Sequence, residues 1–438
     1  MIKRMINKAD FILRDRGLFG LICFVIVKAG QYLERSGHRI ERSLYNSGTT
    51  QRGMEKRHFV DSLETISKSY LISGDKESSL FPLKVENEDV ICWIVPPFSK
   101  GSGGHTTLFR FIRGLEKRGL KSKILLLNDM PVSLTAERVK SEIGQFFGPI
   151  DSEVEVITPF DIRRRASIII CTSWQTAYAA RVMEAKRKIY FMQDFEPYFS
   201  PIGAYSHFAE ETYRFGFEFF TAGPWLLSTV QKKYDGIGEY FTLCPDRSIY
   251  FPRTNFEFLP LLSQIQKKDR PFLVGLYNRV NTSRRCVELA WVALDLVAQR
   301  GAKILVYTFG EDEKHSLPFP NQSLGILNHE ELAQMYTGCD LIIAPSATNL
   351  SLLAREVMAC GGLVLDLEGE NTQAELVHEV NSVLCKATVD SFVEQIESLI
   401  SSHEKLNRVK SRISGSISDL PEWDEQFLKM ANFLSPSV

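Results

Sequence analysis

Short apolar runs alternate with longer amphipathic stretches along most of the chain from about residue 90 onward. Val90–Val95 is a continuous apolar run, typical of a strand buried on both faces. In the stretch that follows, Leu108, Phe111, Ile112 and Leu115 recur at three- and four-residue intervals, which predicts a helix. Strands that alternate with helices predict parallel sheets covered by helices on both faces.

The alternation falls into two series, separated by the turn-forming segment 245–252. In the first we expect strands at 90–95, 123–127, 154–157, 167–171, 188–192, 217–221 and 240–243, with helices that include 176–185 and 225–233. In the second we expect strands at 272–276, 303–309, 323–326, 341–344, 363–366 and 382–384, and helices at 285–300, 329–336, 350–360, 372–379, 391–401 and 404–416. The pattern predicts two doubly wound α/β domains, 86–252 and 253–420, followed by an amphipathic helix in 421–438.

Residues 1–85 differ in kind and form an N-terminal extension. Up to position 42 there are nine Lys or Arg against four Asp or Glu, placed around the apolar run 17–27. That run is too short to cross a bilayer, which takes about 20 apolar residues, and no signal-peptide cleavage site follows it. Two hypotheses stay open: the segment lies on an anionic membrane surface, or it packs on the protein's own body. The polar stretch 46–85 is expected to connect, with at most one helix.

Composition narrows the possible partners and cofactors of the protein further. A net charge of -1 gives no indication of a nucleic-acid partner. The eight cysteines are scattered without a C-x-x-C pair, which favours reduced thiols in a cytoplasmic protein, and no Cys or His spacing suits a metal.

Arg279, Arg284 and Arg285 stand between the expected strand 272–276 and the helix after it. Cations at a helix N-terminus oppose the helix dipole, so their presence there needs a reason. A diphosphate would supply one, because guanidinium groups bind phosphate oxygens in pairs. The alternative is three solvated arginines.

The stretch 344–362 combines a strand end, a polar turn and a helix. Residues 350, 353, 354, 357 and 358 form its buried stripe, and Glu356 falls outside it. Ser346, Thr348 and Asn349 precede the stripe as candidate N-caps. An uncovered helix N-terminus at the carboxyl edge of a parallel sheet suits a phosphate; the alternative is an ordinary core helix.

The first series carries two further candidates. Gly101–Gly104 and His105 occupy its first strand-to-helix turn, where glycines let a ligand approach the backbone. Gln193, Asp194 and Glu196 follow strand 188–192 among aromatic residues, as in a carbohydrate site, although Glu196-Pro197 could simply shape the loop. The common hydrolase, P-loop and dinucleotide motifs G-x-S-x-G, G-x-x-x-x-G-K-[ST] and G-x-G-x-x-G are absent.

Several segments, in this order, resemble a known family. GLYNRVNTSRR, LGILNHEELAQMYTGCDLIIAPSATNLSLLAREVMACGG and the terminal PEWDEQFLKMANFL resemble the donor half of GT-B retaining glycosyltransferases of family four. PDRSIYFP resembles the segment near the hinge between their domains. GGHTTLFRFIRGLEKRG with YFMQDFEPYF is similar to bacterial rhamnosyltransferases that build surface polysaccharides. The resemblance covers roughly residues 88–434.

The resemblance implies a GT-B fold, in which the C-terminal helix crosses back to the N-terminal domain, and a division of roles at the site. Asp194 occupies the place where many relatives keep a catalytic histidine, and the family's usual pair of glutamates has Thr348 at its first position and Glu356 at its second. We expect catalytic roles for Asp194, Arg279 and Arg285, and acceptor contacts for His105, Gln193, Asp194 and Glu196. We expect donor contacts from Gly103, Gly104, Arg279, Arg284, Arg285, Leu327, Glu356 and the backbone of Asn349, Leu350 and Ser351.

The expected activity is retaining transfer of a sugar from a dTDP- or UDP-linked donor, with dTDP-rhamnose favoured, to a glycan or lipid-linked glycan in O-antigen-type polysaccharide synthesis. Nothing besides the nucleotide sugar is expected as cofactor, and no metal. The expected place is the cytoplasm, at the inner face of the cell membrane. A sugar-nucleotide epimerase of the same architecture and a non-catalytic nucleotide-sugar-binding or scaffold protein are the alternatives.

Overall fold

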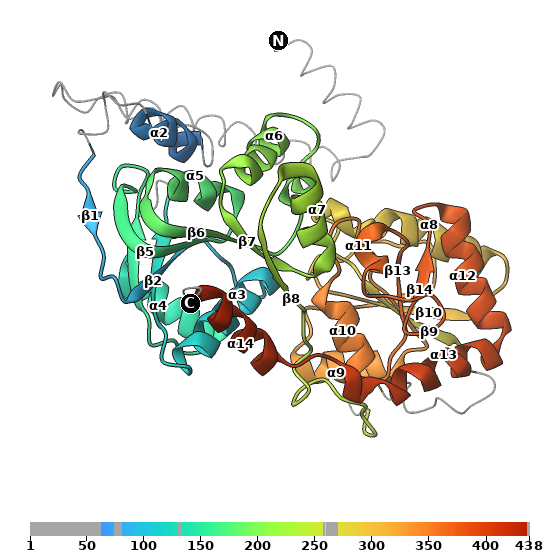
Figure 1. Cartoon of the computed structure of the whole chain (residues 1–438). Coiled ribbons are helices and arrows are strands. Elements are labelled where there is room, and N and C mark those ends of the chain that lie inside the picture. Colours follow the sequence, from blue (N-terminus) through green and yellow to red (C-terminus); the bar gives the residue numbers. More distant parts are fainter. Residues whose placement is uncertain (1–62, 74–80, 130–133, 257–258, 260–269, 436–438) are drawn as a thin grey trace, which may run out of the picture. The chain divides into compact units, whose positions relative to one another are not determined.

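A computed structural model describes residues 63–73, 81–129, 134–256, 259 and 270–435 (Figure 1). The basic segment 1–42 therefore lies outside the described residues, and so do both hypotheses about it. Within the described ranges, no helix is both long enough and apolar enough to cross a membrane.

The first domain is built on an eight-stranded parallel sheet in the order β4-β3-β2-β5-β6-β7-β8, with β1 paired to β5. Helices α3 and α4 lie on one face of the sheet and α5, α6 and α7 on the other (Figure 1). The strands are β1 (Lys84–Val85), β2 (Val90–Val95), β3 (Lys121–Leu127), β4 (Glu153–Ile157), β5 (Arg164–Cys171), β6 (Glu184–Met192), β7 (Glu218–Ala222) and β8 (Gly238–Phe241). The helices are α2 (Leu63–Ser73), α3 (Gly103–Glu116), α4 (Ala136–Phe147), α5 (Trp174–Val182), α6 (Ala204–Glu211) and α7 (Pro224–Tyr234).

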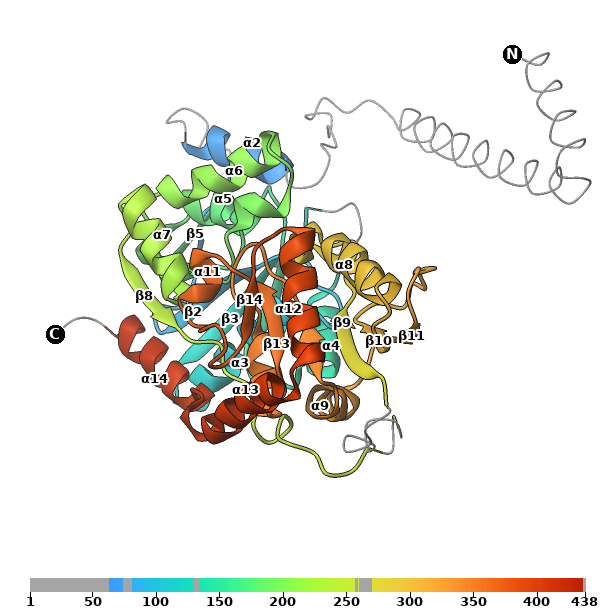
Figure 2. The same ribbon diagram turned by 90° about the vertical axis from the view of Figure 1, so that its right-hand side faces the viewer.

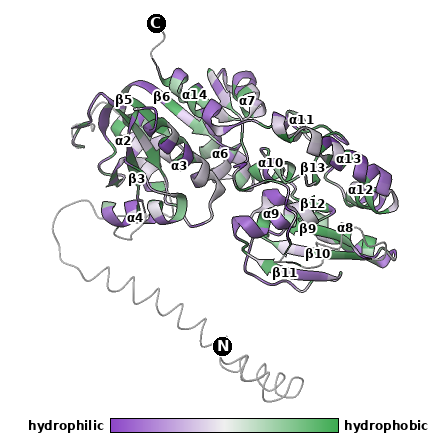
Figure 3. Ribbon diagram, turned by 90° about the horizontal axis from the view of Figure 1, so that it is seen from below, coloured by the Kyte–Doolittle hydropathy of each residue, from purple (hydrophilic) through white to green (hydrophobic). Residues whose placement is uncertain are grey.

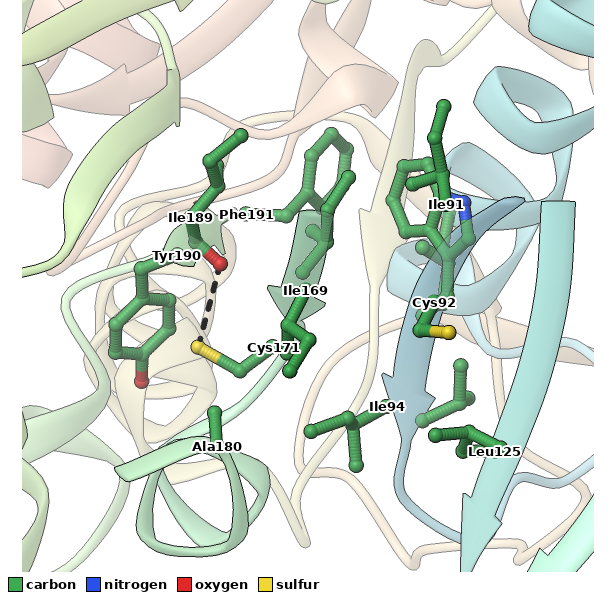
Figure 4. Close-up of a cluster of buried hydrophobic side chains, with 14 of the residues drawn as sticks. Ile91, Cys92, Ile94, Leu125, Ile169, Cys171, Ala180, Ile189, Tyr190 and Phe191 are labelled. Carbon is green, nitrogen blue, oxygen red and sulfur yellow. Dashed lines mark hydrogen bonds between the residues drawn. The ribbon is translucent and has the colours of Figure 1, made fainter. Parts of the chain in front are cut away.

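The core explains the continuous apolar runs. Cys92 and Ile94 on β2 and Ile169 on β5 have no exposed surface, because helices cover both faces of the sheet. Figure 4 shows their side chains packed between the strands, and the Cys171 thiol donating to the carbonyl oxygen of Ile189 at 3.5 Å. Every cysteine of the described part is a free thiol, as expected; Cys23 lies outside it.

The second domain has a six-stranded parallel sheet in the order β11-β10-β9-β12-β13-β14. In both sheets the strand order along the chain reverses after the third strand in space. This is the doubly wound arrangement that the alternation predicted. The elements are β9 (Phe272–Tyr277), β10 (Ile304–Phe309), β11 (Asn321–Gly325), β12 (Leu341–Ile343), β13 (Val364–Leu367), β14 (Val383–Cys385), α8 (Val287–Gln299), α9 (His329–Gly338), α10 (Leu352–Ala359), α11 (Glu370–Gln373), α12 (Val389–Ser401), α13 (His403–Gly415) and α14 (Trp423–Leu434).

Hydropathy follows position in this sheet. Figure 3 shows β9 and β10 as hydrophobic and the edge strand β11 as hydrophilic. Figure 2 places β11 at the rim beside β10, which is its one partner among the described strands. A polar edge strand discourages pairing with another chain.

Two of the expected helices have different bounds in the structure. The helix expected at 350–360 begins only at Leu352, with Ser351 as N-cap and no side-chain cap bond, so Leu350 belongs to the turn. The helix expected at 372–379 is the short α11; the chain beyond it turns, and Glu379 has a positive φ of 57°.

Helix α14 returns to the first domain and packs on α3 and β8, as expected of the C-terminal segment. Phe427, Met430 and Leu434 join the core of that domain.

The segment expected to be a connecting extension contributes to the first domain. Helix α2 packs on α5, where Ile66 meets Trp174 and Tyr178, and β1 extends the sheet beside β5. Among the described residues, the first domain therefore begins by Leu63.

Candidate functional site

The two loops expected to bind the donor are neighbours in the second domain. One follows β9 and the other follows β12, and these strands pair at the point where the strand order reverses. Ligands of doubly wound sheets bind at this point. The backbone N–H of Ala347 donates to the carbonyl oxygen of Arg284 at 2.9 Å, so the two loops are also tied to each other.

The turn before α10 is held from within its own domain. Asp366, at the end of β13, accepts a hydrogen bond from the backbone N–H of Ser346 at 2.7 Å. The Ser346 hydroxyl donates to the carbonyl oxygen of Asn349 at 2.6 Å, and Asn371 donates to that of Ser346 at 3.1 Å. Burial raises the pKa of Asp366 to about 7. The backbone of this turn is thus fixed without a ligand.

Asn349 links this turn to the first domain. Its side-chain amide donates to the carbonyl oxygens of Gln193 at 3.0 Å and Ala222 at 2.8 Å. Its backbone N–H donates to the Asp194 carboxylate at 3.0 Å. Gln193 in turn donates to the carbonyl oxygen of Gly104 at 3.0 Å. Four of the residues expected at the site, Gly104, Gln193, Asp194 and Asn349, are therefore joined by direct contacts.

The three arginines point in different directions. The Nε of Arg284 lies 3.3 Å from the Asp194 carboxylate, and its guanidinium lies over the ring of Phe199. Arg279 is exposed and donates to the carbonyl oxygen of Gly310 at 3.2 Å. Arg285 lies over the ring of Tyr277 in its own domain. Arg284 is thus the arginine that contacts Asp194, and with Gly104, Gln193, Asp194 and Asn349 it forms what we call the Asp194 cluster.

Two residues expected to contact an acceptor already have partners in the protein. The ring nitrogen Nδ1 of His105 lies 2.8 Å from the Ser102 hydroxyl, and burial lowers its pKa to about 4, so the ring is neutral at pH 7. The Glu196 carboxylate accepts from the backbone N–H of Trp174 at 2.7 Å and from the Tyr190 hydroxyl at 3.1 Å. Burial raises the pKa of Glu196 to about 8. These positions favour a role in holding the loops over direct contact with an acceptor.

Glu356 faces a set of residues that the sequence patterns did not single out. Burial raises its pKa to about 7, against the opposing effects of the Arg110 charge and the Tyr250 hydroxyl. Arg110, on α3, also lies 3.4 Å from the Asp246 carboxylate. The available signal was a cation on α3 between buried Phe109 and Phe111, together with the hinge-proximal PDRSIYFP segment, which holds Asp246 and Tyr250.

The remaining expected donor contacts are divided between the two domains. Leu327 follows β11 and is half-buried, and Leu350 is buried in the domain's core. Thr348, at the position of the family's first glutamate, is only 1% exposed. Its hydroxyl has no hydrogen-bond partner among the residues that the structure describes. Gly103, exposed at the start of α3, has open space where a side chain would stand.

No family model matches the chain. One curated relative, the O-antigen biosynthesis protein RfbC of Myxococcus xanthus, is 25% identical over 368 residues. That match takes in 80% of this chain but only 28% of the relative, so the chain spans little more than a quarter of the relative's length.

Solved structures share the architecture. HepE from Anabaena, crystallised with UDP, matches with a TM-score of 0.59 at 14% identity, over 79% of this chain and 100% of HepE. Sucrose-phosphate synthase from Thermosynechococcus elongatus matches with a TM-score of 0.57 at 11% identity, over 78% and 98% of the two chains. A glycosyltransferase from Rickettsia africae matches with a TM-score of 0.56 at 13% identity, over 80% and 100%. The chain thus has the GT-B fold of glycosyltransferases, with two parallel-sheet α/β domains.

Proposed function

We propose that the protein is a retaining GT-B glycosyltransferase that moves a sugar from a nucleotide diphosphate donor to a glycan or lipid-linked glycan of a cell-surface polysaccharide. One observation carries the proposal: the loop after β9, the turn after β12 and the loop after β6 meet at the Asp194 cluster. The first two present a guanidinium and a backbone N–H from one domain, and the third presents a carboxylate from the other. The GT-B fold and the distant O-antigen relative support the same class of reaction.

In this proposal the arginines stabilise the leaving diphosphate, because guanidinium groups neutralise the charge that develops on its oxygens. The half-buried Glu356 accepts hydrogen bonds from the ribose hydroxyls of the donor. The acceptor hydroxyl attacks from the face that the diphosphate leaves, and a diphosphate oxygen takes its proton. This assignment includes no metal and no cofactor beyond the donor.

The donor itself is the finer part of the proposal. The solved HepE structures hold UDP and UDP-glucose, which supports a nucleotide diphosphate of this kind. We favour dTDP-rhamnose, from the resemblance of YFMQDFEPYF and the segment 103–119 to rhamnosyltransferases. A thermal-shift screen of dTDP-rhamnose, UDP-glucose and other nucleotide sugars separates these donors, because a ligand at a hundredfold excess over its Kd stabilises by about 2.7 kcal/mol.

Transfer itself is tested with Arg279→Ala and Glu356→Ala, each of which should abolish product formation from the donor that the screen selects. Arg300→Ala and Glu397→Ala are matched controls, because these residues pair on the surface of the same domain at 3.2 Å. Near-normal turnover in both site variants would contradict the proposal. Isomerised donor or free sugar formed without an acceptor would favour the epimerase instead.

We also propose that residues 1–42 bring the enzyme to the inner face of the cell membrane. Anionic vesicles should retain the full chain but release a chain starting at Phe59. The truncation stops ahead of α2, because removing that helix would uncover Trp174 and Tyr178. Equal retention of both chains would contradict a membrane role for the segment.

A further inference from the structure

The Asp194 carboxylate is bound in the way a phosphate would be. Its Oδ1 accepts hydrogen bonds from the backbone N–H groups of Phe195 at 2.8 Å and Asn349 at 3.0 Å. Its Oδ2 lies 3.3 Å from the Nε of Arg284. Backbone N–H groups ahead of a helix and a guanidinium are the groups that bind phosphate oxygens in proteins.

Two of the three groups that contact the Asp194 carboxylate belong to one preformed unit. Asn349 and Arg284 lie on different loops of the second domain, and the hydrogen bond from Ala347 to the carbonyl oxygen of Arg284 ties the loops together. The side chain of Phe199, from the first domain, supports the Arg284 guanidinium at 4.4 Å. The anion that joins them, Asp194, comes from the first domain, after β6.

We propose that Asp194 is an internal stand-in for a donor phosphate: without donor its carboxylate occupies the anion site made by Asn349 and Arg284, and the diphosphate displaces it. The inference rests on the proposed function in taking the natural ligand to be a nucleotide diphosphate. Two anions cannot share one N–H group and one guanidinium at these distances without strong repulsion. Donor binding therefore breaks the contacts of Asp194 with the second domain and frees its carboxylate for the reacting sugar.

Competition of this kind has a measurable consequence. The apparent affinity of a ligand equals its intrinsic affinity multiplied by the fraction of molecules whose site is free. If Asp194 fills the site in nine-tenths of the molecules, binding is therefore weakened about tenfold. Asp194→Asn keeps the side-chain oxygen that accepts from Asn349 and removes the negative charge. We expect this variant to bind UDP and inorganic pyrophosphate about threefold to tenfold more tightly than the wild type, by calorimetric titration at constant ionic strength.

Glu218→Gln is the matched control. It removes the same charge from the same sheet, at the start of β7, where Glu218 pairs with Arg187 at 2.6 Å. Its Kd for both probes should equal that of the wild type. A similar gain in this variant would show that net charge alone is responsible and would overturn the proposal.

A second measurement needs no ligand. In the free protein, amide hydrogen exchange in the peptide that holds Asn349 should be faster in Asp194→Asn, because an amide oxygen is a weaker acceptor than a carboxylate, and pyrophosphate should restore protection. Unchanged exchange, or binding of pyrophosphate no tighter than in the wild type, would overturn the stand-in. If pyrophosphate binds more tightly to the variant while no nucleotide diphosphate binds either protein, the stand-in holds and the proposed donor fails.

Discussion

The ring of Phe427 on α14 lies directly against Gly114 on α3, so close that a β-carbon on Gly114 would meet the ring at 2.4 Å. The absence of a side chain at position 114 is what lets the C-terminal helix return to the first domain. The two domains are therefore connected twice along the chain, once through the segment 242–271 and once through the segment that leads into α14.

We expect Gly114→Ala to destabilise the protein in spite of the better helix propensity of alanine. Propensity would add about 1 kcal/mol, whereas overpacking against a ring costs about 1–3 kcal/mol. Urea unfolding measures the balance. Gly144→Ala is the control, because Gly144 stands in α4 with no atom near its would-be β-carbon, and it should gain about 0.5–1 kcal/mol. Equal gains in the two variants would contradict the packing.

Removing the Asn349 side chain should destabilise the protein less than replacing it with a negatively charged one. Asn349→Ala removes the donors to the carbonyl oxygens of Gln193 and Ala222, at a cost of about 1–3 kcal/mol. Asn349→Asp should cost more, because a carboxylate cannot donate and would face both carbonyl oxygens and the Asp194 carboxylate. Chemical denaturation of the two variants checks the order, and an Asp variant as stable as the Ala variant would contradict the geometry.

The strands and the two parallel sheets were accessible from sequence because burial on both faces leaves continuous apolar runs. The apolar run at Val90–Val95 predicted β2 with its observed ends, and the alternation predicted both doubly wound domains. The start of α10 was harder to place. Ser346, Thr348 and Asn349 all looked like caps, but Ser346 and Asn349 use their side chains to fix the turn and to reach the other domain.

The site was predictable only where chemistry and position in the fold coincide. Arg284, Asp194 and Asn349 each follow a strand at its carboxyl end, and the topology brings them into contact. Their pairing could not be read from spacing, because 155 positions separate Asp194 from Asn349. Arg110 was missed for a similar reason: it stands on α3 of the first domain, far in sequence from Glu356 on α10 of the second, whose carboxyl its charge affects.

Buried carboxyls should make the protein less stable as pH rises. The pKa of Glu196 is about 8 in the folded chain against 4.5 ordinarily. Between those values the native state keeps a proton that the unfolded state has lost, so the stability that this group contributes is full below pH 4.5 and declines toward pH 8. One such group adds a slope of at most about 1.4 kcal/mol per pH unit.

Glu196→Gln should therefore reduce the decline in Tm between about pH 5 and pH 8. Its amide can still accept from the backbone N–H of Trp174, so the loop keeps its anchor. Part of the decline should persist, since the pKa values of Glu356 and Asp366 are also raised by burial, to about 7. A variant with the same pH dependence as the wild type would show that Glu196 is ionised in the native state.

The amino end of the first sheet holds a buried ion network whose loss should be costly. Arg164 is 1% exposed and pairs with Glu86 at 2.6 Å and Glu155 at 2.8 Å. Arg164→Met would leave these carboxylates with less compensating charge, and removing one partner of a buried pair costs about 3–5 kcal/mol. The neighbouring Arg165 is the matched control, since its pair with Glu184 is exposed and such pairs contribute about 0–1 kcal/mol. In urea unfolding, Arg164→Met should lose several times more free energy of unfolding than Arg165→Met. Equal costs would mean that Lys123, 2.9 Å from both Glu86 and Glu155, compensates for the missing guanidinium.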